Sequence, residues 1–228
     1  MSYENLDLDI ADGVACITLN RPKVGNAISP DLARDLSDAA GRCDDNADVR
    51  AVVVTGSGKL FCAGGDLGAM ATAGDEVKSV IKIMAGDLHM ALSRLSRGNA
   101  PVIAAVNGTA GGAGMSLVMA TDLAICGASA KFTMAYTNAG LSPDGSSTFF
   151  MPRKIGDRRT RELILTNRVL SAAEAEEWGI VNRVVADDQV LAESMTLAKT
   201  LAEGPTLAYG ASKALLNETF EHGLEAQM

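Results

Sequence analysis

Apolar residues along this chain recur with two spacings, one typical of buried strands and one typical of amphipathic helices. Short runs dense in Val, Ile and Ala predict strands at 14–19, 49–55 and 101–106. The last two have no polar alternation, which is typical of strands buried on both faces of a sheet. Apolar positions three and four residues apart predict helices at 30–43, 75–97 and 115–120. The alternation of these elements is typical of an α/β protein.

Turn and cap residues mark the boundaries of several elements. Asn20-Arg21-Pro22 predicts a turn after the first strand, because proline disfavours a helical conformation in the residue before it. Ser29-Pro30 resembles a helix N-cap followed by proline at the first helical position. Farther along, weaker patterns predict strands at 123–126 and 131–134, a loop around 140–147, and helices at 158–165, 171–178, 188–203 and 205–220.

The length and composition favour one domain. The chain has 228 residues, 47% of them hydrophobic, which is enough for a sizeable core. No low-complexity linker or fixed-period repeat divides it. We therefore predict a single domain over 1–228, with a core over about 1–185 and a C-terminal helical region over about 186–228.

Charge and cysteine usage exclude several classes of function. The net charge of -8 leaves no basic stripe, which argues against nucleic acid and anionic membranes as partners. The four cysteines form no C-x-x-C pair and the two histidines form no cluster, so we expect neither a disulfide framework nor a metal site. The N-terminus lacks the features of a signal peptide, and no apolar stretch approaches the roughly 18 residues that span a bilayer. We expect a cytoplasmic protein.

Two glycine-rich corners, at 59–67 and 107–114, each follow a predicted strand and precede a helical pattern. Glycine allows tight turns and close approach of a ligand to the backbone, and a helix N-terminus offers unpaired N–H groups. Two such corners can direct backbone N–H groups at one oxygen atom and so form an oxyanion hole.

Other glycine and serine motifs fail on spacing. Residues 56–59 lack the preceding glycine of a phosphate-binding P-loop, and Phe61 and Leu117 occupy the third glycine position of a dinucleotide fingerprint. Residues 114–118 lack the final glycine of a hydrolase nucleophile elbow. His89, the candidate base, lies inside the predicted helix 75–97, where we interpret it as a packing or capping residue.

Two further side chains are candidates for chemistry. Cys62 lies in the first corner, but no base is adjacent to activate it, so we interpret it as a small buried hydrophobe. Asp144 lies in Ser142-Pro143-Asp144-Gly145, a loop that continues neither a helix nor a strand. Taken alone, Asp144 before Gly145-Ser146-Ser147 favours an Asx-turn or an N-cap over a catalytic carboxylate.

Several motifs together resemble the crotonase family, the enoyl-CoA hydratase/isomerase superfamily, over nearly the whole chain. They are Asn20–Ala27, Phe61–Asp66, Ala105–Gly108 with the glycines after it, Ala120–Asp122 and Leu170–Asn182. The resemblance implies a crotonase-like spiral of ββα units with a C-terminal helical extension, shorter here than in most members, and a homotrimer or hexamer. It also implies an acyl-CoA thioester substrate, with no cofactor beyond the coenzyme A of that substrate.

The resemblance also implies the site residues. The two amides that bind the thioester oxygen map to Gly65 and Ala113, and fixed donors there favour the enolate over the ground state. The coenzyme A moiety is expected to lie beside Lys23, Val24, Ala27, Ala63, Asp66 and Leu67. Asp122 is expected to be structural.

Departures from the family pattern carry the functional prediction. The two positions at which family hydratases hold water with glutamates carry Ser116 and Tyr136, which are not acid-base groups near neutral pH. Asp144 instead matches the carboxylate of family isomerases, and Gly140–Asp144 with Phe149–Arg153 resembles the phenylacetate-pathway type most. The resemblance therefore predicts an isomerase in which Asp144 moves a proton, with Ser116 and Tyr136 shaping the acyl pocket.

Three alternatives stay open at the level of sequence. Asp144 matches the nucleophile of the family's aromatic dehalogenases, which is a different use of the same carboxylate. The chain could also be a non-catalytic acyl-CoA-binding subunit, or a hydratase as overall family likeness suggests.

Overall fold

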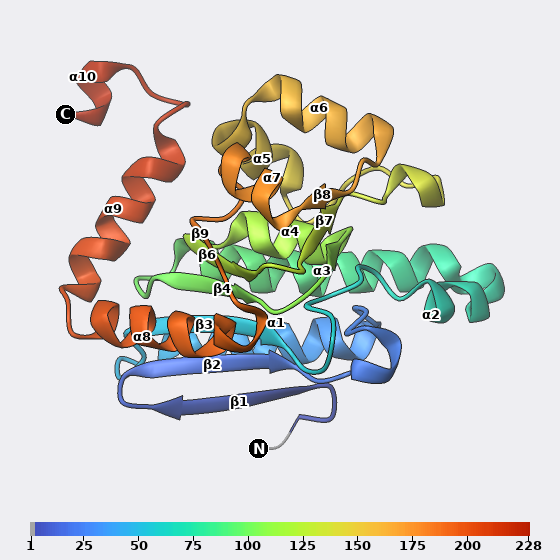
Figure 1. Ribbon diagram of the computed structural model, residues 1–228, viewed down its shortest axis with the longest axis horizontal. Coiled ribbons are helices and arrows are strands. Elements are labelled where there is room, and N and C mark those ends of the chain that lie inside the picture. Colours follow the sequence, from blue (N-terminus) through green and yellow to red (C-terminus); the bar gives the residue numbers. More distant parts are fainter. Residues whose placement is uncertain (1–2) are drawn as a thin grey trace.

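A six-stranded sheet with the order β1-β2-β3-β4-β6-β9 forms the centre of the protein, in a computed structural model that describes residues 3–228 (Figure 1). The strand β1 pairs antiparallel with β2, and the other neighbours are parallel. The bounds are β1 Leu6–Ala11, β2 Val14–Leu19, β3 Ala51–Gly56, β4 Val102–Val106, β6 Leu123–Gly127 and β9 Arg183–Val185. A smaller sheet has the order β5-β7-β8, with bounds β5 Ala110–Gly111, β7 Lys131–Thr133 and β8 Leu170–Ser171.

Alternate residues of β3 show how the sheet is covered on both faces. Val52 and Val54 belong to the large apolar cluster beneath the helices α1 and α3, whereas Ala51 and Val53 face the cluster that includes Val190 of α8. The apolar character of β3 thus follows from burial on both faces. The helices that flank the large sheet are α1 Pro30–Asp45, α3 Val77–Arg97 and α8 Val190–Ala202.

The remaining helices are α2 Leu67–Thr72, α4 Ala113–Ala120, α5 Ser147–Ile155, α6 Asp157–Thr166, α7 Ala172–Trp178, α9 Thr206–Glu218 and α10 Leu224–Gln227. Of these, α5, α6 and α7 lie above the small sheet, α4 contacts β5 and α3, α2 lies beside one end of α3, and α9 and α10 lie along the opposite side (Figure 1). Within residues 3–228 no helix combines the length and the apolar character that a membrane crossing requires.

The C-terminal helices contact the rest of the protein in two different ways. The helix α8 packs on the large sheet and belongs with its core, while α9 and α10 extend away along one side (Figure 1). Lys213 fastens α9 to the body: its Nζ donates to the carbonyls of Leu95 and Ala100 and lies 2.8 Å from Oδ2 of Asp122. Asp122 also accepts from the Val102 N–H, so the structure agrees with its predicted structural role.

The sequence patterns did not predict two helices that border the site. The helix α5 contains Pro152, and its N-cap Ser146 has a left-handed φ of 57° with no side-chain cap, so neither a start signal nor a periodic pattern marks it. The helix α2 is short and begins at the end of the first glycine corner, where Asp66 caps it by accepting from the Ala69 N–H.

Candidate active site

The two glycine corners meet directly through their backbones. The Cys62 N–H donates to Thr109 O at 3.1 Å and the Gly111 N–H donates to Cys62 O at 2.9 Å, a short parallel bridge between the corners. A Cβ on Gly114 would lie 2.3 Å from Cys62 O, well inside van der Waals contact distance, and would clash with it. Glycine at this position is therefore required for the corners to pack together.

Gly65 and Ala113 carry backbone amides with no protein acceptor among the described residues. Ile28 bonds to both neighbours of Gly65, donating to Gly64 O at 2.7 Å and accepting from the Asp66 N–H at 2.9 Å. The Gly65 amide, between them, is left to face the opposite side. Ala113 is the first residue of α4, where N–H groups have no helical partner. A Cβ on Gly64 would lie 3.5 Å from the Ala113 nitrogen, so the two amides are near neighbours.

Gly65 and Ala113 both line a cavity of about 310 Å³ between the corners, α3 and the loop before α5. Its wall is mostly apolar and comes from α2, α3 and that loop, including Met70, Met84, Leu88 and Leu141. Of the described residues that line it, Asp144 is the only carboxylate and Lys82 the only cation. An apolar cavity with two free amides and one carboxylate suits an apolar carbonyl compound.

Asp144 is held in this cavity by a chain of hydroxyl groups. The Tyr136 hydroxyl donates to Oδ1 of Asp144 at 2.6 Å, and Ser116 Oγ lies 3.0 Å from the same hydroxyl. Ser116 Oγ also donates to the Asp144 carbonyl at 3.1 Å. Burial raises the pKa of Tyr136, and the adjacent Asp144 charge raises it further, so Tyr136 keeps its proton and acts as a donor.

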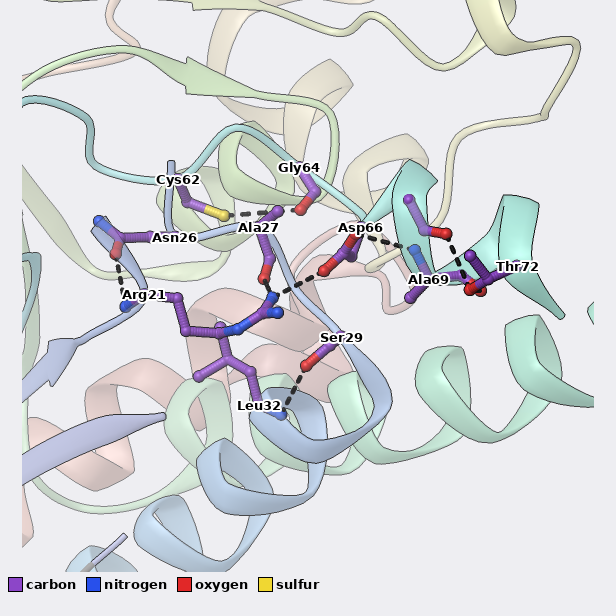
Figure 2. A network of polar contacts seen from close by, with 11 residues as sticks. Arg21, Asn26, Ala27, Ser29, Leu32, Cys62, Gly64, Asp66, Ala69 and Thr72 are labelled. Atoms are coloured by element: carbon purple, nitrogen blue, oxygen red, sulfur yellow. Dashed lines mark hydrogen bonds and ion pairs between the residues drawn. The ribbon is translucent and has the colours of Figure 1, made fainter. Parts of the chain in front are cut away.

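The first loop is fixed to the first corner by Arg21 and Asn26 (Figure 2). Arg21 Nη1 donates to the Ala27 carbonyl and lies 2.8 Å from Oδ2 of Asp66. The side-chain amide of Asn26 donates to three backbone carbonyls of residues 57–61, and its own oxygen accepts from the Arg21 N–H. These bonds set the path of the loop toward Gly64 and Gly65.

The structure brings some of the predicted site residues to the cavity and leaves others outside its wall. Those that line it are Gly65, Ala113, Asp144, Ala63, Leu67 and Tyr136. Ser116 lies behind Tyr136 and Asp144 and bonds to both. Lys23, Val24, Ala27 and Asp66 lie outside the wall: the first two are exposed on the loop after β2, and the last two bond to Arg21.

Two side chains were interpreted from sequence as non-catalytic. Cys62 is fully buried, and desolvation raises the pKa of its thiol to about 12, so it packs as the sequence predicted. His89 is exposed, yet its Nε2 accepts a 3.1 Å hydrogen bond from the Gly145 N–H, beside Asp144. No helical pattern signals this contact, because it depends on where the loop 140–146 folds.

A larger hollow, of about 680 Å³, lies where β3 and β4 begin, between the ends of α1 and α3 and the start of α9. It contains none of the predicted site residues. Across residues 3–228, no cluster of three or more His, Cys, Asp and Glu side chains is arranged to hold a metal ion.

Comparisons with known proteins show the family to which the chain belongs. The enoyl-CoA hydratase/isomerase family matches residues 9–228. The chain is 39% identical to 4-chlorobenzoyl coenzyme A dehalogenase-2 of Arthrobacter over 82% of its length and 68% of that protein. It is 38% identical to a protein of Rhodobacter capsulatus named "probable enoyl-CoA hydratase", over 82% of this chain and 71% of that one.

Solved structures extend the similarity to the whole fold. An enoyl-CoA hydratase from Bacillus anthracis superposes with a TM-score of 0.91 at 30% identity, covering 98% of this chain and 86% of that one. A Pseudomonas aeruginosa protein superposes with a TM-score of 0.92 at 34% identity, covering 100% and 97% of the two chains. The expected crotonase fold is thus confirmed, and the chain belongs to the enoyl-CoA hydratase/isomerase family of acyl-CoA-processing enzymes.

Proposed function

We propose that this enzyme moves a double bond along the acyl chain of a CoA thioester, with Asp144 as the group that carries the proton. The observation that supports this most is that one carboxylate, and no second one, shares the described cavity wall with the two unpartnered amides of Gly65 and Ala113. Adding water across a double bond with paired carboxylates needs a second acid-base group in this cavity. Moving a proton between two carbons needs only one.

The reaction proceeds in two proton transfers. The Asp144 carboxylate removes a proton from the carbon next to the thioester carbonyl, or from the γ carbon, and the electron pair of that C–H bond moves into the conjugated system. The thioester oxygen takes up the negative charge and accepts hydrogen bonds from the Gly65 and Ala113 amides. The protonated Asp144 then returns its proton to the other carbon, which leaves the double bond shifted. No cofactor is needed.

Tyr136 and Ser116 prepare the carboxylate for this task. Because Tyr136 donates to Oδ1 at 2.6 Å, that oxygen is occupied and Oδ2 is left to accept the substrate proton. Ser116 contacts the hydroxyl of Tyr136 and the carbonyl of Asp144, so it holds the two residues at a fixed position relative to each other. Neither side chain replaces the missing carboxylates of a hydratase.

Binding of the CoA moiety by the exposed Lys23 and Val24 on the first loop is part of the same proposal. The positive charge of the exposed Lys23 suits the phosphates of CoA. Assembly as a homotrimer or hexamer remains a prediction from the family resemblance.

A panel of 3-enoyl-CoA thioesters, aliphatic and phenylacetyl-derived, tests the proposal. We expect conversion to the conjugated 2-enoyl isomer with no change in mass in H₂O, and deuterium at the α or γ carbon in D₂O. The phenylacetyl-derived substrates test the subtype expected from sequence. No isomer from any 3-enoyl-CoA, together with addition of one water to a conjugated 2-enoyl-CoA assayed separately, would contradict the proposal and identify a hydratase.

A second candidate has a specific observation in its favour, because a relative at 39% identity is named a dehalogenase. In that reaction an Asp144 oxygen would attack the halogen-bearing ring carbon, halide would leave, and water would hydrolyse the aryl ester. Single turnover of 4-chlorobenzoyl-CoA in H₂¹⁸O separates the two. Release of chloride with ¹⁸O in the Asp144 carboxyl supports dehalogenation, and no chloride release excludes it.

A further inference from the structure

We propose that His89 is a positioning residue for Asp144, and that it works only in its neutral form with the proton on Nδ1. This inference rests on the proposed function, because it concerns the carboxylate that carries the proton. His89 lies on α3 and does not line the cavity. It contacts the site through the hydrogen bond that its Nε2 accepts from the Gly145 N–H.

The peptide group between Asp144 and Gly145 is held from both sides. On its carbonyl side, the Asp144 oxygen accepts from Ser116 Oγ at 3.1 Å and from Ser147 Oγ at 2.9 Å. On its amide side, the Gly145 N–H donates to His89 Nε2 at 3.1 Å. A peptide group fixed at both ends cannot rotate, so the Asp144 Cα and its carboxyl keep one direction relative to the cavity.

The conformation of this segment explains why it needs such restraints. Gly145 and Ser146 both have a left-handed φ of 57°, which a non-glycine residue such as Ser146 adopts at a cost of about 1 kcal/mol. A Cβ on Gly145 would lie 2.7 Å from Cβ of Ser116, so the turn is packed tightly against α4. Strained backbone beside a reacting group persists where surrounding contacts determine it.

The hydrogen bond at Gly145 requires an unprotonated Nε2. A backbone N–H can only donate, so the imidazole nitrogen that faces it must present its lone pair. The other nitrogen, Nδ1, then carries the proton. If the imidazole took up a second proton, on Nε2, two donors would face each other: the Nε2–H group and the Gly145 N–H. The hydrogen bond that restrains the amide side of the peptide group would then be lost.

His89 takes up that proton directly from solvent, because its side chain is exposed in a groove between α3, α5 and α9. The charged groups that line this groove together with His89 are Arg97 of α3, Glu218 of α9 and Glu221 after α9. An imidazole changes charge between about pH 5 and 8. A proton on Nε2 therefore releases the Asp144 segment on its amide side.

The test compares His89→Gln with His89→Leu. Glutamine can place its amide oxygen where Nε2 stands and does not titrate, whereas leucine removes the acceptor. We expect His89→Leu to lower kcat about tenfold with KM within twofold, and His89→Gln to stay within threefold of wild type. Ser93→Ala, one turn along the same groove, is the control and should leave kcat unchanged.

Two pH readouts separate positioning from a general structural role. The wild-type kcat should fall on acidification from about pH 8 to 5, and that limb should be absent in His89→Gln. The NMR resonance of the Gly145 amide should shift with the same midpoint in wild type and stay constant in His89→Gln. This second readout needs no turnover, so it holds even if the isomerase proposal fails. A wild-type kcat in His89→Leu, or a Gly145 resonance that ignores pH in wild type, would overturn the inference.

Discussion

The hydroxyl of Tyr136 and the carboxylate of Asp144 form a 2.6 Å hydrogen bond in which the tyrosine is held as the donor, because burial and the carboxylate charge both raise the pKa of Tyr136. A hydrogen bond to a charged group is worth more than one between neutral groups, roughly 1.5 to 3 kcal/mol. This pair therefore orients the carboxylate as well as stabilising its charge.

Replacing that donor should slow the reaction without weakening substrate binding. For Tyr136→Phe we expect kcat to fall about tenfold and KM to change less than twofold, since the acyl wall keeps its aromatic ring while Asp144 loses its orienting bond. Steady-state kinetics on a 3-enoyl-CoA measures this. Tyr209→Phe makes the same chemical change on α9, away from the cavity, and should match wild type. A tenfold loss in both variants would show that the effect is not specific to Asp144.

The contact between the glycine corners should not tolerate a methyl group. In Gly114→Ala the new Cβ would lie 2.3 Å from Cys62 O, which is backbone and cannot move away alone. We expect the free energy of unfolding in urea to fall by roughly 3 kcal/mol. A Cβ on Gly86 of α3 would meet nothing within 4 Å, so Gly86→Ala should instead stabilise the helix by roughly 0.5 to 1 kcal/mol. Equal effects at the two positions would contradict the close approach.

The ion pair between Arg21 and Asp66 should make stability depend on pH in the acid range. Partial burial disfavours the Asp66 charge, but the hydrogen bonds from the Ala69 N–H and from Arg21 outweigh it and lower the pKa of Asp66 below 3.8. A lowered folded-state pKa contributes stability above the unfolded pKa, and this contribution is lost as pH falls through the folded pKa.

Asp66→Asn keeps a capping oxygen for Ala69 but removes the charge, so it isolates the ion pair. At pH 7 we expect it to lower the free energy of unfolding by about 1 kcal/mol. The difference from wild type should shrink once the pH falls below 3.8, the ordinary value for this carboxyl group. Urea titrations at a series of pH values measure it, and a difference that grows on acidification would have the wrong sign.

The attachment of α9 should depend strongly on Lys213, whose Nζ makes two of the hydrogen bonds of this helix to the rest of the protein. The Lys213 side chain is 8% exposed and pairs with the partly buried Asp122, so Lys213→Met leaves that carboxylate without its cation. The expected loss is about 2 kcal/mol in urea, together with faster hydrogen exchange over 206–218. Lys199→Met breaks only the exposed pair with Asp12, at 3.8 Å, and should cost less than about 1 kcal/mol. Unchanged exchange in α9 of the Lys213 variant would refute this attachment.

Much of the core could be predicted from sequence because its signals are local. The strand at 49–55 and the helix that begins at Ser29-Pro30 were both found, the latter because the serine side chain caps Leu32 as its sequence position predicts. The helix α5 was missed for the opposite reason. Its left-handed N-cap, Ser146, and internal Pro152 contradict every local rule, and only packing against α4 and α6 maintains it.

The site was predicted in part for a similar reason. Glycine corners indicate free amides, so Gly65 and Ala113 could be identified from the sequence and its family resemblance. The contacts of Asp144 with Tyr136 and Ser116, and of Gly145 with His89, join segments up to 56 residues apart, and no spacing rule connects them. The sequence and its family resemblance therefore predicted a role for Asp144, and the fold shows which groups hold this residue.

The role of Asp144 is tested most directly by Asp144→Asn, which keeps the shape of the side chain and removes its basicity. Isothermal titration should give a Kd for a non-reactive acyl-CoA thioester within threefold of wild type, while the rate of 3-enoyl-CoA isomerisation falls roughly a thousandfold. An Asp144→Asn enzyme that isomerises within tenfold of the wild-type rate would contradict the account.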